Sequence, residues 1–236
     1  QALNETVVSV SNQESRPILT GIHLRFTDTH FIVEATDSHT LSQKRLPKPE
    51  NAPEKLDLVL PTLAIKQLQQ LTTDELLFAY DESSAVFTSE NVTLTTRLIE
   101  GNYPDVDRLL GGHYGRQTVM DTKELQDTVK RAQIILSNGE KGHTLLHTDG
   151  IATITAKAPE NVANLSETLT TFTETLEEDE DQTFDIAFNP SFMAKLLATL
   201  KSDLVNIDFM GPVRPMRITS PDDDNLLHLL TPVRQN

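Results

Sequence analysis

The sequence predicts an α+β fold built from two copies of one domain, because the chain resembles itself and strand patterns lead directly into short helices. Residues 56–61 read as a strand that leads into a helix over 63–71. The same pattern returns at 184–190, followed by a helix over 191–201. A repeat of roughly 130 residues is too long for one unit of a solenoid, so it indicates a duplicated domain. An alternating strand follows each helix, at 76–80 and at 205–209.

A further helix and a pair of strands precede each of these segments. In the second copy, Asp121 and Glu124 indicate a helix N-terminus with a capping box, and the helix is expected over 122–136. Each copy is then expected to hold two helices on one face of about eight short antiparallel strands. In the second copy, strands are also expected at 143–147 and 151–157. In the first copy, the corresponding elements are a helix at 3–11 and strands at 18–26 and 31–35. The expected domains are 1–110 and 118–236, joined by a glycine-rich linker over 111–117.

The composition is that of a globular protein. Hydrophobic residues make up 37% and charged residues 23% of the 236 residues, and no stretch reaches the roughly 18 apolar residues that a membrane-spanning helix needs. The absence of cysteine excludes disulfides, thiolate metal sites and cysteine nucleophiles. The first residues, QALNETVVSV, contain neither an initiator Met nor the basic and apolar regions of a signal peptide. We therefore expect a cytoplasmic protein whose sequence begins inside a longer chain.

The net charge of −15 argues against nucleic acid as a partner, because phosphate binding depends on clustered Lys and Arg. The excess acid lies on strands and loops, however, while the predicted helices carry a small positive net charge. One interpretation is that the polar face of a helix commonly carries Lys. The other is a mildly basic, helix-lined face that holds DNA without reading its bases. The residues of that face would be Lys66, Lys123, Lys130, Arg131, Lys195 and Lys201.

Three groups of residues superficially suggest chemistry, and each has a simpler interpretation. Asp37, Ser38 and His39 are adjacent on an extended segment, so they point to opposite faces and cannot form a Ser–His–Asp relay. His143 and His147 are four residues apart on a strand, which gives no helical metal site. The acidic run at 177–181 lacks the spacing and the glycine of an EF-hand loop. We expect no catalysis, metal or cofactor at these positions.

Three short motifs, in order along the chain, are typical of one family. They are ATDSHTL at 35–41, EGNYPD at 100–105 and TPVR at 231–234. Together with the duplicated domain, they make the whole chain resemble the β subunit of bacterial DNA polymerase III, the processivity clamp. The resemblance implies the middle and C-terminal DNA-clamp domains of a three-domain subunit, two of which join head to tail as a ring around duplex DNA. Helices would line the inside of the ring, and sheets would form its outside.

The resemblance also implies a pocket between the two domains that binds short linear motifs of the replicative polymerase, the clamp loader and repair proteins. Ser38 and Thr40 stand where the family often has Gly and Arg, and the chain end at 235–236 is less apolar than is usual. Replacement of Leu41 or Leu230 by Asp is expected to weaken peptide binding at least about a hundredfold. The fold should survive the change if these side chains are partly exposed in the free protein. The implied pocket residues are Leu19, Thr36, Ser38, His39, Thr40, Leu41, Pro104, Arg108, Leu109, Asn189, Phe192, Leu230, Thr231, Pro232, Val233 and Arg234.

The residues alone leave two other classes of function to consider, an enzyme and an adhesion module. An enzyme lacks support, since the sequence contains no glycine-rich phosphate loop, nucleophile elbow or paired-carboxylate motif. A secreted or surface β-rich adhesion module would suit the acidity and the lack of cysteine. A basic, helix-lined concavity would favour the clamp, whereas a two-sheet sandwich without helices would favour adhesion.

Overall fold

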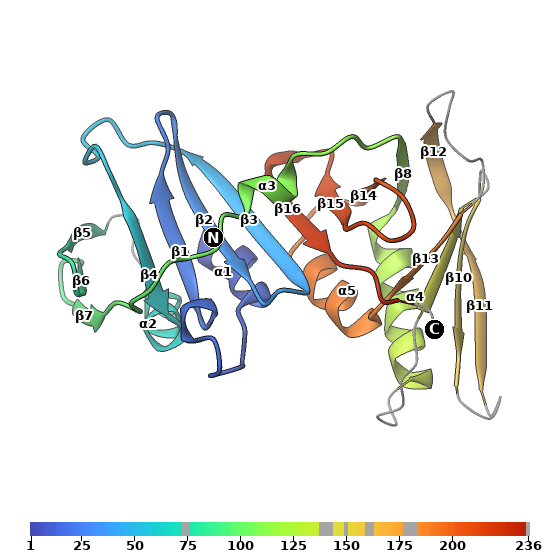
Figure 1. Cartoon of the computed structure of the whole chain (residues 1–236), viewed down its shortest axis with the longest axis horizontal. Coiled ribbons are helices and arrows are strands. Elements are labelled where there is room, and N and C mark those ends of the chain that lie inside the picture. The colour runs from blue at the N-terminus through green and yellow to red at the C-terminus, as the bar shows by residue number, and fades with distance from the viewer. Residues whose placement is uncertain (72–75, 137–143, 149–150, 159–162, 177–183, 235–236) are drawn as a thin grey trace. The chain divides into compact units, whose positions relative to one another are not determined.

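The chain forms two compact units, unit 1 (Gln1–Val106) and unit 2 (Asp107–Asn236) (Figure 1). The computed structural model describes residues 1–71, 76–136, 144–148, 151–158, 163–176 and 184–234. The residues predicted as a linker, 111–117, lie in unit 2 and enter a strand at Arg116. No helix within the described ranges combines the length and the apolar character needed to cross a membrane.

Unit 1 contains two antiparallel sheets, one with the order β3-β2-β1-β4 and one with the order β5-β6-β7. Its first helix is shorter than predicted, because α1 (Ala2–Thr6) passes into a 3-10 turn (Val7–Ser9). Thr6 Oγ1 donates to the Ala2 carbonyl at 2.9 Å, and the β-branched residues Thr6 and Val7 disfavour a longer α-helix. The other elements are a 3-10 turn (Pro17–Leu19), β1 (Gly21–Phe26), β2 (His30–Thr36), β3 (Thr40–Pro47), β4 (Asp57–Pro61), α2 (Thr62–Leu68), β5 (Leu77–Tyr80), β6 (Ser84–Thr88) and β7 (Thr93–Arg97).

The two faces of the larger sheet of unit 1 differ in chemistry. Alternate residues of β1 and β4 point into the apolar core, where they pack with Ile65 and Leu68 of α2. The residues between them point to the opposite face. On β1 these include His23, which is 5% exposed, and Arg25. The sheet therefore separates an apolar core from a polar cluster on its other side.

Unit 2 repeats the arrangement of unit 1. The sheet order β11-β10-β9-β13 corresponds strand for strand to β3-β2-β1-β4, and β13 runs into α5 as β4 runs into α2. This confirms the duplicated domain. A second sheet has the order β12-β8-β14-β15-β16, in which β8 and β12 have no counterpart among the described residues of unit 1. The elements are α3 (Asp107–Leu110), β8 (Arg116–Asp121), α4 (Thr122–Ile135), β9 (Thr144–Thr148), β10 (Ala152–Lys157), β11 (Asn164–Leu169), β12 (Thr171–Leu176), β13 (Phe184–Phe188), α5 (Pro190–Leu197), β14 (Leu204–Phe209), β15 (Met216–Ser220) and β16 (Asp223–Leu230).

The start of α4 is fixed partly as predicted. Asp121 is the N-cap residue, and its Oδ1 accepts the N–H of Glu124 at 2.7 Å. Glu124 takes a different partner from the one that a capping box requires, since its Oε2 accepts the N–H of Thr170 at 2.8 Å. Gln126 Nε2 donates to the Leu197 carbonyl of α5 at 2.8 Å, which ties the two helices together. The N-terminal half of α4 is thus held by long-range contacts as well as by its cap.

Candidate functional site

In unit 1, several of the implied pocket residues gather where β2 turns into β3. Thr36 and Leu41 are partners in the strand register. Asp37 Oδ1 accepts the N–H groups of His39 at 2.9 Å and of Thr40 at 2.7 Å, so its carboxylate fixes the turn. This carboxylate therefore stabilises the backbone of the turn. This agrees with a structural rather than a catalytic role for the Asp-Ser-His run.

Ser38 at the tip of this turn has a φ of 74°, in the left-handed region that favours glycine. The conformation gives a physical reason for the frequent Gly at this place in the family that the sequence resembles. Arg16 Nη1 donates to Ser38 Oγ at 3.3 Å and so ties the turn to the segment that leads to Leu19. Leu19, at the end of the 3-10 turn, is 4% exposed.

In unit 2, the end of the chain lies beside β13 and bounds a groove. The N–H of Val233 donates to the carbonyl of Ala187 at 2.7 Å, so the last described residues extend along this edge strand. The chain-end groove has a volume of about 840 Å³. Its lining residues are Asp185, Ala187, Pro212, Val213, Arg214, Thr231, Pro232, Val233 and Arg234.

The walls of the chain-end groove combine exposed apolar groups with basic ones. Val213 is 75% and Val233 is 39% exposed, while Arg214 and Arg234 supply positive charge. Residues 231–234 belong to a sequence motif and were predicted, whereas residues 212–214 were not. Residues 212–214 occupy the turn between β14 and β15, which follows Gly211 with a φ of 118°. Their sequence signal is weak, because it consists of one apolar residue between Pro212 and Arg214.

Five implied residues of unit 2 are not part of this lining. Asn189 is the N-cap of α5, and its Oδ1 accepts the N–H of Ser191 at 2.8 Å. Phe192 is partly exposed and lies under Lys195, whose Nζ is 5.8 Å from the ring centroid. Leu109 is 49% exposed on α3. The other two are Arg108, which is exposed, and Leu230.

The condition for the fold to survive Asp at Leu41 or Leu230, partial exposure of these side chains, is not met. Leu41 is 2% exposed and Leu230 is 0% exposed. Leu41 lies opposite Thr36 at the start of β3, and Leu230 lies opposite the fully buried Met216 at the end of β16. An aspartate at either position would place an unpaired carboxylate inside the fold and disrupt folding itself.

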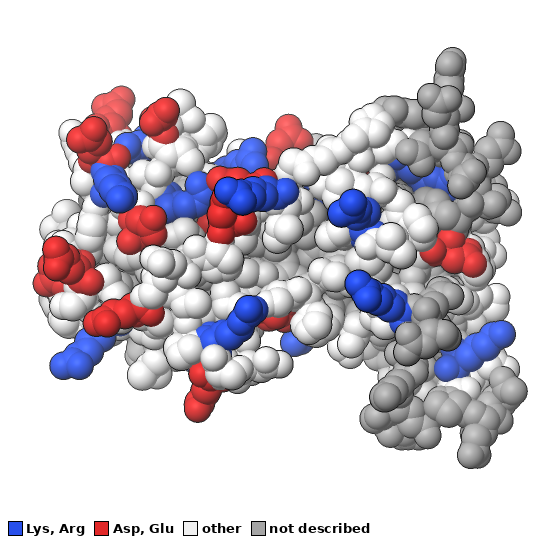
Figure 2. Space-filling view, viewed as in Figure 1, with Lys and Arg blue, Asp and Glu red and all other residues white. Residues whose placement is uncertain are grey.

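The basic residues of α4 are largely paired within unit 2. Asp127 contacts both Lys123, at 3.0 Å, and Lys130, at 3.5 Å, and the hydrogen bond from Lys123 holds the pKa of Asp127 below its usual value. Arg131 donates through Nε and Nη2 to the two carboxylate oxygens of Glu167. Figure 2 likewise shows acidic and basic side chains interleaved over unit 1 on the face that it draws. Of the six proposed DNA-facing residues, the three that are exposed and have no carboxylate partner within the described ranges are Lys66, Lys195 and Lys201.

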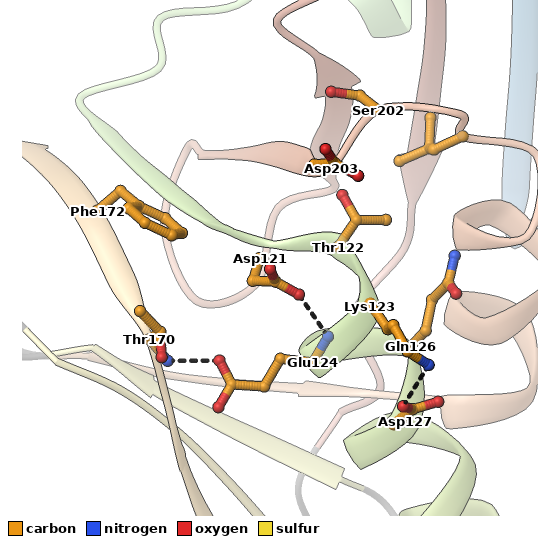
Figure 3. Close-up of a pocket in the computed structure, with 11 residues that line it drawn as sticks. Asp121, Thr122, Lys123, Glu124, Gln126, Asp127, Thr170, Phe172, Ser202 and Asp203 are labelled. Atoms are coloured by element: carbon orange, nitrogen blue, oxygen red, sulfur yellow. Dashed lines mark hydrogen bonds and ion pairs between the residues drawn. The ribbon is translucent and has the colours of Figure 1, made fainter.

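A second cavity of unit 2, of about 640 Å³, lies at the start of α4 (Figure 3). Three of its carboxylates, those of Asp121, Glu124 and Asp127, are already engaged by the cap, by Thr170 and by Lys123. Across the described ranges, no group of three or more His, Cys, Asp or Glu is placed to hold a metal ion. His143 and the acidic run at 177–181 lie outside the described residues.

In a comparison with known proteins, the two parts of the chain match two domains of the same protein family. Residues 1–105 match the family model of the DNA polymerase III beta subunit, central domain, and residues 108–234 match that of its C-terminal domain. The beta sliding clamp of Streptococcus pneumoniae (strain TIGR4) is 36% identical, over 99% of this chain and 62% of that protein. This chain therefore spans less than two thirds of the length of that curated relative.

Solved structures agree with the match. The beta subunit from the DNA polymerase of Streptococcus pyogenes is 34% identical with a TM-score of 0.90, over 99% of this chain and 63% of that one. The DNA polymerase sliding clamp from Bacillus subtilis is 26% identical with a TM-score of 0.89, over 99% of this chain and 61% of that one.

Proposed function

We propose, since the chain belongs to the DNA polymerase III beta-subunit family, that it functions as part of a sliding clamp, a processivity factor that encircles duplex DNA and tethers the replicative polymerase. It acts as a binding platform and not as an enzyme. The relatives named beta sliding clamp support this role over an adhesion module. So do α4 and α5, which are tied together in unit 2, because an adhesion sandwich would lack such helices.

The tethering site is a peptide-binding pocket whose proposed residues fall into two groups. Those of unit 1 are the turn at 36–41 with Leu19 and Pro104, and those of unit 2 are the chain-end groove with Arg108, Leu109, Asn189, Phe192 and Leu230. The observation that carries this proposal is the groove itself, whose lining includes exposed Val213 and Val233 together with Arg214 and Arg234. Its ligand is a short linear motif with a Gln followed by apolar and aromatic residues.

The expected affinity of this pocket is modest. Each apolar side chain of the peptide that is buried there contributes roughly 1.5–3 kcal/mol, from which the cost of ordering the peptide is subtracted. The result is a Kd on the order of micromolar. Such contacts suffice because a ring on DNA holds its partner at high effective concentration. The clamp loader and repair proteins use the same pocket, on a homodimeric ring in the cytoplasm at the nucleoid.

Titration of the protein with a fluorescent peptide that carries the Gln-x-apolar-aromatic motif tests this function. We expect saturable binding with a Kd on the order of micromolar. The control is the same peptide with Ala at the Gln and the aromatic positions, for which binding should fall at least about tenfold. Equal binding of the two peptides, or none at roughly millimolar protein, would refute the tethering site.

This chain alone is expected to bind linear duplex DNA weakly. Only Lys66, Lys195 and Lys201 of the proposed DNA-facing residues have no carboxylate partner in the described part of the chain, and the net charge is −15. Neutralisation of about three phosphates gives a slope near −3 in a plot of log K against log salt concentration. Fluorescence anisotropy with a labelled duplex measures this slope, and nanomolar binding that resists salt would contradict the expectation.

A further inference from the structure

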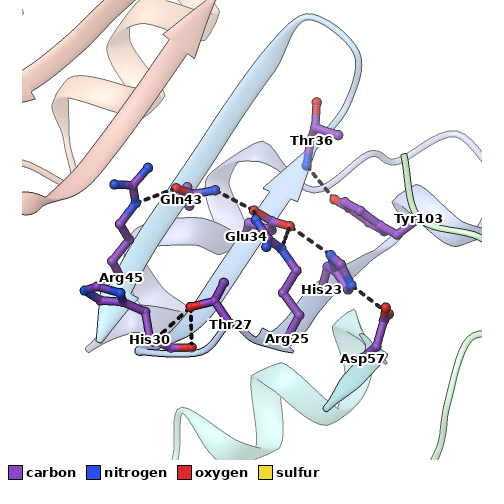
Figure 4. Close-up of polar contacts among 10 residues, drawn as sticks. All are labelled: His23, Arg25, Thr27, His30, Glu34, Thr36, Gln43, Arg45, Asp57 and Tyr103. Carbon is purple, nitrogen blue, oxygen red and sulfur yellow. Dashed lines mark hydrogen bonds and ion pairs between the residues drawn. The ribbon is translucent and has the colours of Figure 1, made fainter. Parts of the chain in front are cut away.

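A buried polar cluster on the strands of unit 1 reaches the turn at 36–41 through Tyr103 and Thr36 (Figure 4). At its centre is His23 of β1, which is 5% exposed. His23 Nδ1 is 2.9 Å from Glu34 Oε1, and His23 Nε2 is 3.0 Å from Asp57 Oδ1. Because both ring nitrogens contact carboxylate oxygens on neighbouring strands, the ring cannot rotate without losing both contacts.

Tyr103, in the segment that follows β7, attaches to this cluster at two points. Its ring stacks on the His23 ring with 4.4 Å between the centroids and 26° between the planes. Its hydroxyl oxygen accepts the N–H of Thr36 at 2.9 Å. Burial raises the pKa of the Tyr103 hydroxyl, so the group stays neutral at physiological pH. Tyr103 therefore joins a rigid imidazole on β1 to the last residue of β2.

Without the Tyr103 hydroxyl, the Thr36 N–H would lack an acceptor on the β1 side of β2. The register between β1 and β2 runs from Phe26 opposite Phe31 to His23 opposite Glu34, and it stops before Thr36. A buried N–H without an acceptor is costly, so the Tyr103 hydroxyl replaces the missing strand at this point.

The turn at 36–41 depends on Thr36 in turn. Thr36 Oγ1 donates to the Thr40 carbonyl at 2.6 Å and accepts the N–H of Ser38 at 3.2 Å. A displacement of Thr36 therefore moves the whole turn. Pro104 directly follows Tyr103 in the chain, so the same tyrosine also fixes Pro104 relative to the turn.

We propose that Tyr103 is a positioning residue for the peptide pocket. Its ring on His23 and its hydroxyl on the Thr36 N–H hold Pro104 and the turn at 36–41 at the spacing that a bound apolar motif requires. The role rests on the proposed function, and it concerns affinity for short peptides rather than for DNA.

The test is Tyr103→Phe, which keeps the stacked ring and removes the acceptor of the Thr36 N–H. We expect the Kd of the fluorescent motif peptide to rise about threefold to tenfold, the range for one lost hydrogen bond. The Thr36 amide should exchange with deuterium at least about fivefold faster in nuclear magnetic resonance spectra. Tyr103→Leu, which also removes the ring, should weaken peptide binding further than Tyr103→Phe does.

The two other tyrosines provide matched controls. Tyr114→Phe removes a buried hydroxyl that has no hydrogen-bond partner in the described structure, and Tyr80→Phe removes one that donates to the Lys55 carbonyl at 2.6 Å. Both variants should bind the peptide as the wild type does, with unchanged exchange at Thr36.

The outcomes separate the two proposals. If the wild type binds the motif peptide and Tyr103→Phe binds it equally well, the positioning role is overturned while the pocket stands. A fall in the unfolding midpoint of Tyr103→Phe with an unchanged Kd overturns it in the same way, because it shows a role in stability alone. A wild type that does not bind the peptide overturns the pocket and the positioning role together.

Discussion

Replacing Glu34 by Gln is expected to destabilise the protein by about 3–5 kcal/mol, the cost of removing one partner from a buried charged network. The Glu34 side chain is 1% exposed and is surrounded by donors. Arg25 Nε donates to Oε1 at 2.8 Å and Gln43 Nε2 donates to Oε2 at 2.7 Å, while His23 Nδ1 is 2.9 Å from Oε1. A neutral amide removes the ion pair between Glu34 and Arg25 and weakens the hydrogen bonds that the carboxylate accepts. Urea denaturation followed by circular dichroism measures the loss.

The pH dependence of this loss has a definite sign. Burial raises the pKa of Glu34, but the hydrogen bonds from His23, Arg25 and Gln43 outweigh burial and hold the pKa below its ordinary value of 4.5. A lowered pKa stabilises the folded state above pH 4.5, and this stabilisation is lost as the pH falls through the folded-state value. The difference in unfolding free energy between the wild type and Glu34→Gln should therefore be full at neutral pH and shrink below pH 4.5.

Glu167→Gln is the matched control, because it makes the same chemical change in an exposed ion pair. Arg131 and Glu167 have side chains that are 49% and 28% exposed. Solvent screens such a pair, so its loss should cost less than about 1 kcal/mol. Equal and small effects of the two substitutions would show that the Glu34 network does not stabilise unit 1.

The duplicated fold could be predicted because its signals are local. The strand at 184–188 and the helix that begins at Pro190 are each defined by neighbours in sequence, and their earlier counterparts repeat the pattern. Helix ends were less predictable, because long-range contacts decide them. Glu124, for example, binds the N–H of Thr170 instead of completing a capping box.

The site was predictable only where the sequence carries a motif. The turn at 36–41 and the chain end at 231–234 match short family patterns, whereas the groove residues at 212–214 follow none. The cluster of His23, Glu34 and Asp57 was missed because strand register alone brings these residues together, and register is set by the whole sheet. The burial of Leu41 and Leu230 could not be predicted from the sequence, because exposure depends on packing between strands.

Val233→Asp is expected to weaken binding of the motif peptide about a hundredfold, roughly 2.8 kcal/mol. Val233 is 39% exposed in the chain-end groove, so an aspartate there can be solvated in the free protein and the fold should survive. In the complex, the carboxylate would face an apolar side chain of the peptide and lose its water. The backbone bond from the Val233 N–H to the Ala187 carbonyl remains, so the chain end keeps its place beside β13. Calorimetric titration with the peptide gives the change in Kd.

Val92→Asp makes the same substitution at a valine of similar exposure, 43%, between β6 and β7 of unit 1 and outside the proposed pocket. It adds the same negative charge to the protein, so it controls for long-range repulsion of the peptide. We expect Val92→Asp to bind the peptide as the wild type does and Val213→Asp, in the groove, to bind it more weakly. Circular dichroism confirms that each variant is folded. If folded Val233→Asp and Val92→Asp bind the peptide equally well, the chain-end groove does not bind the apolar motif.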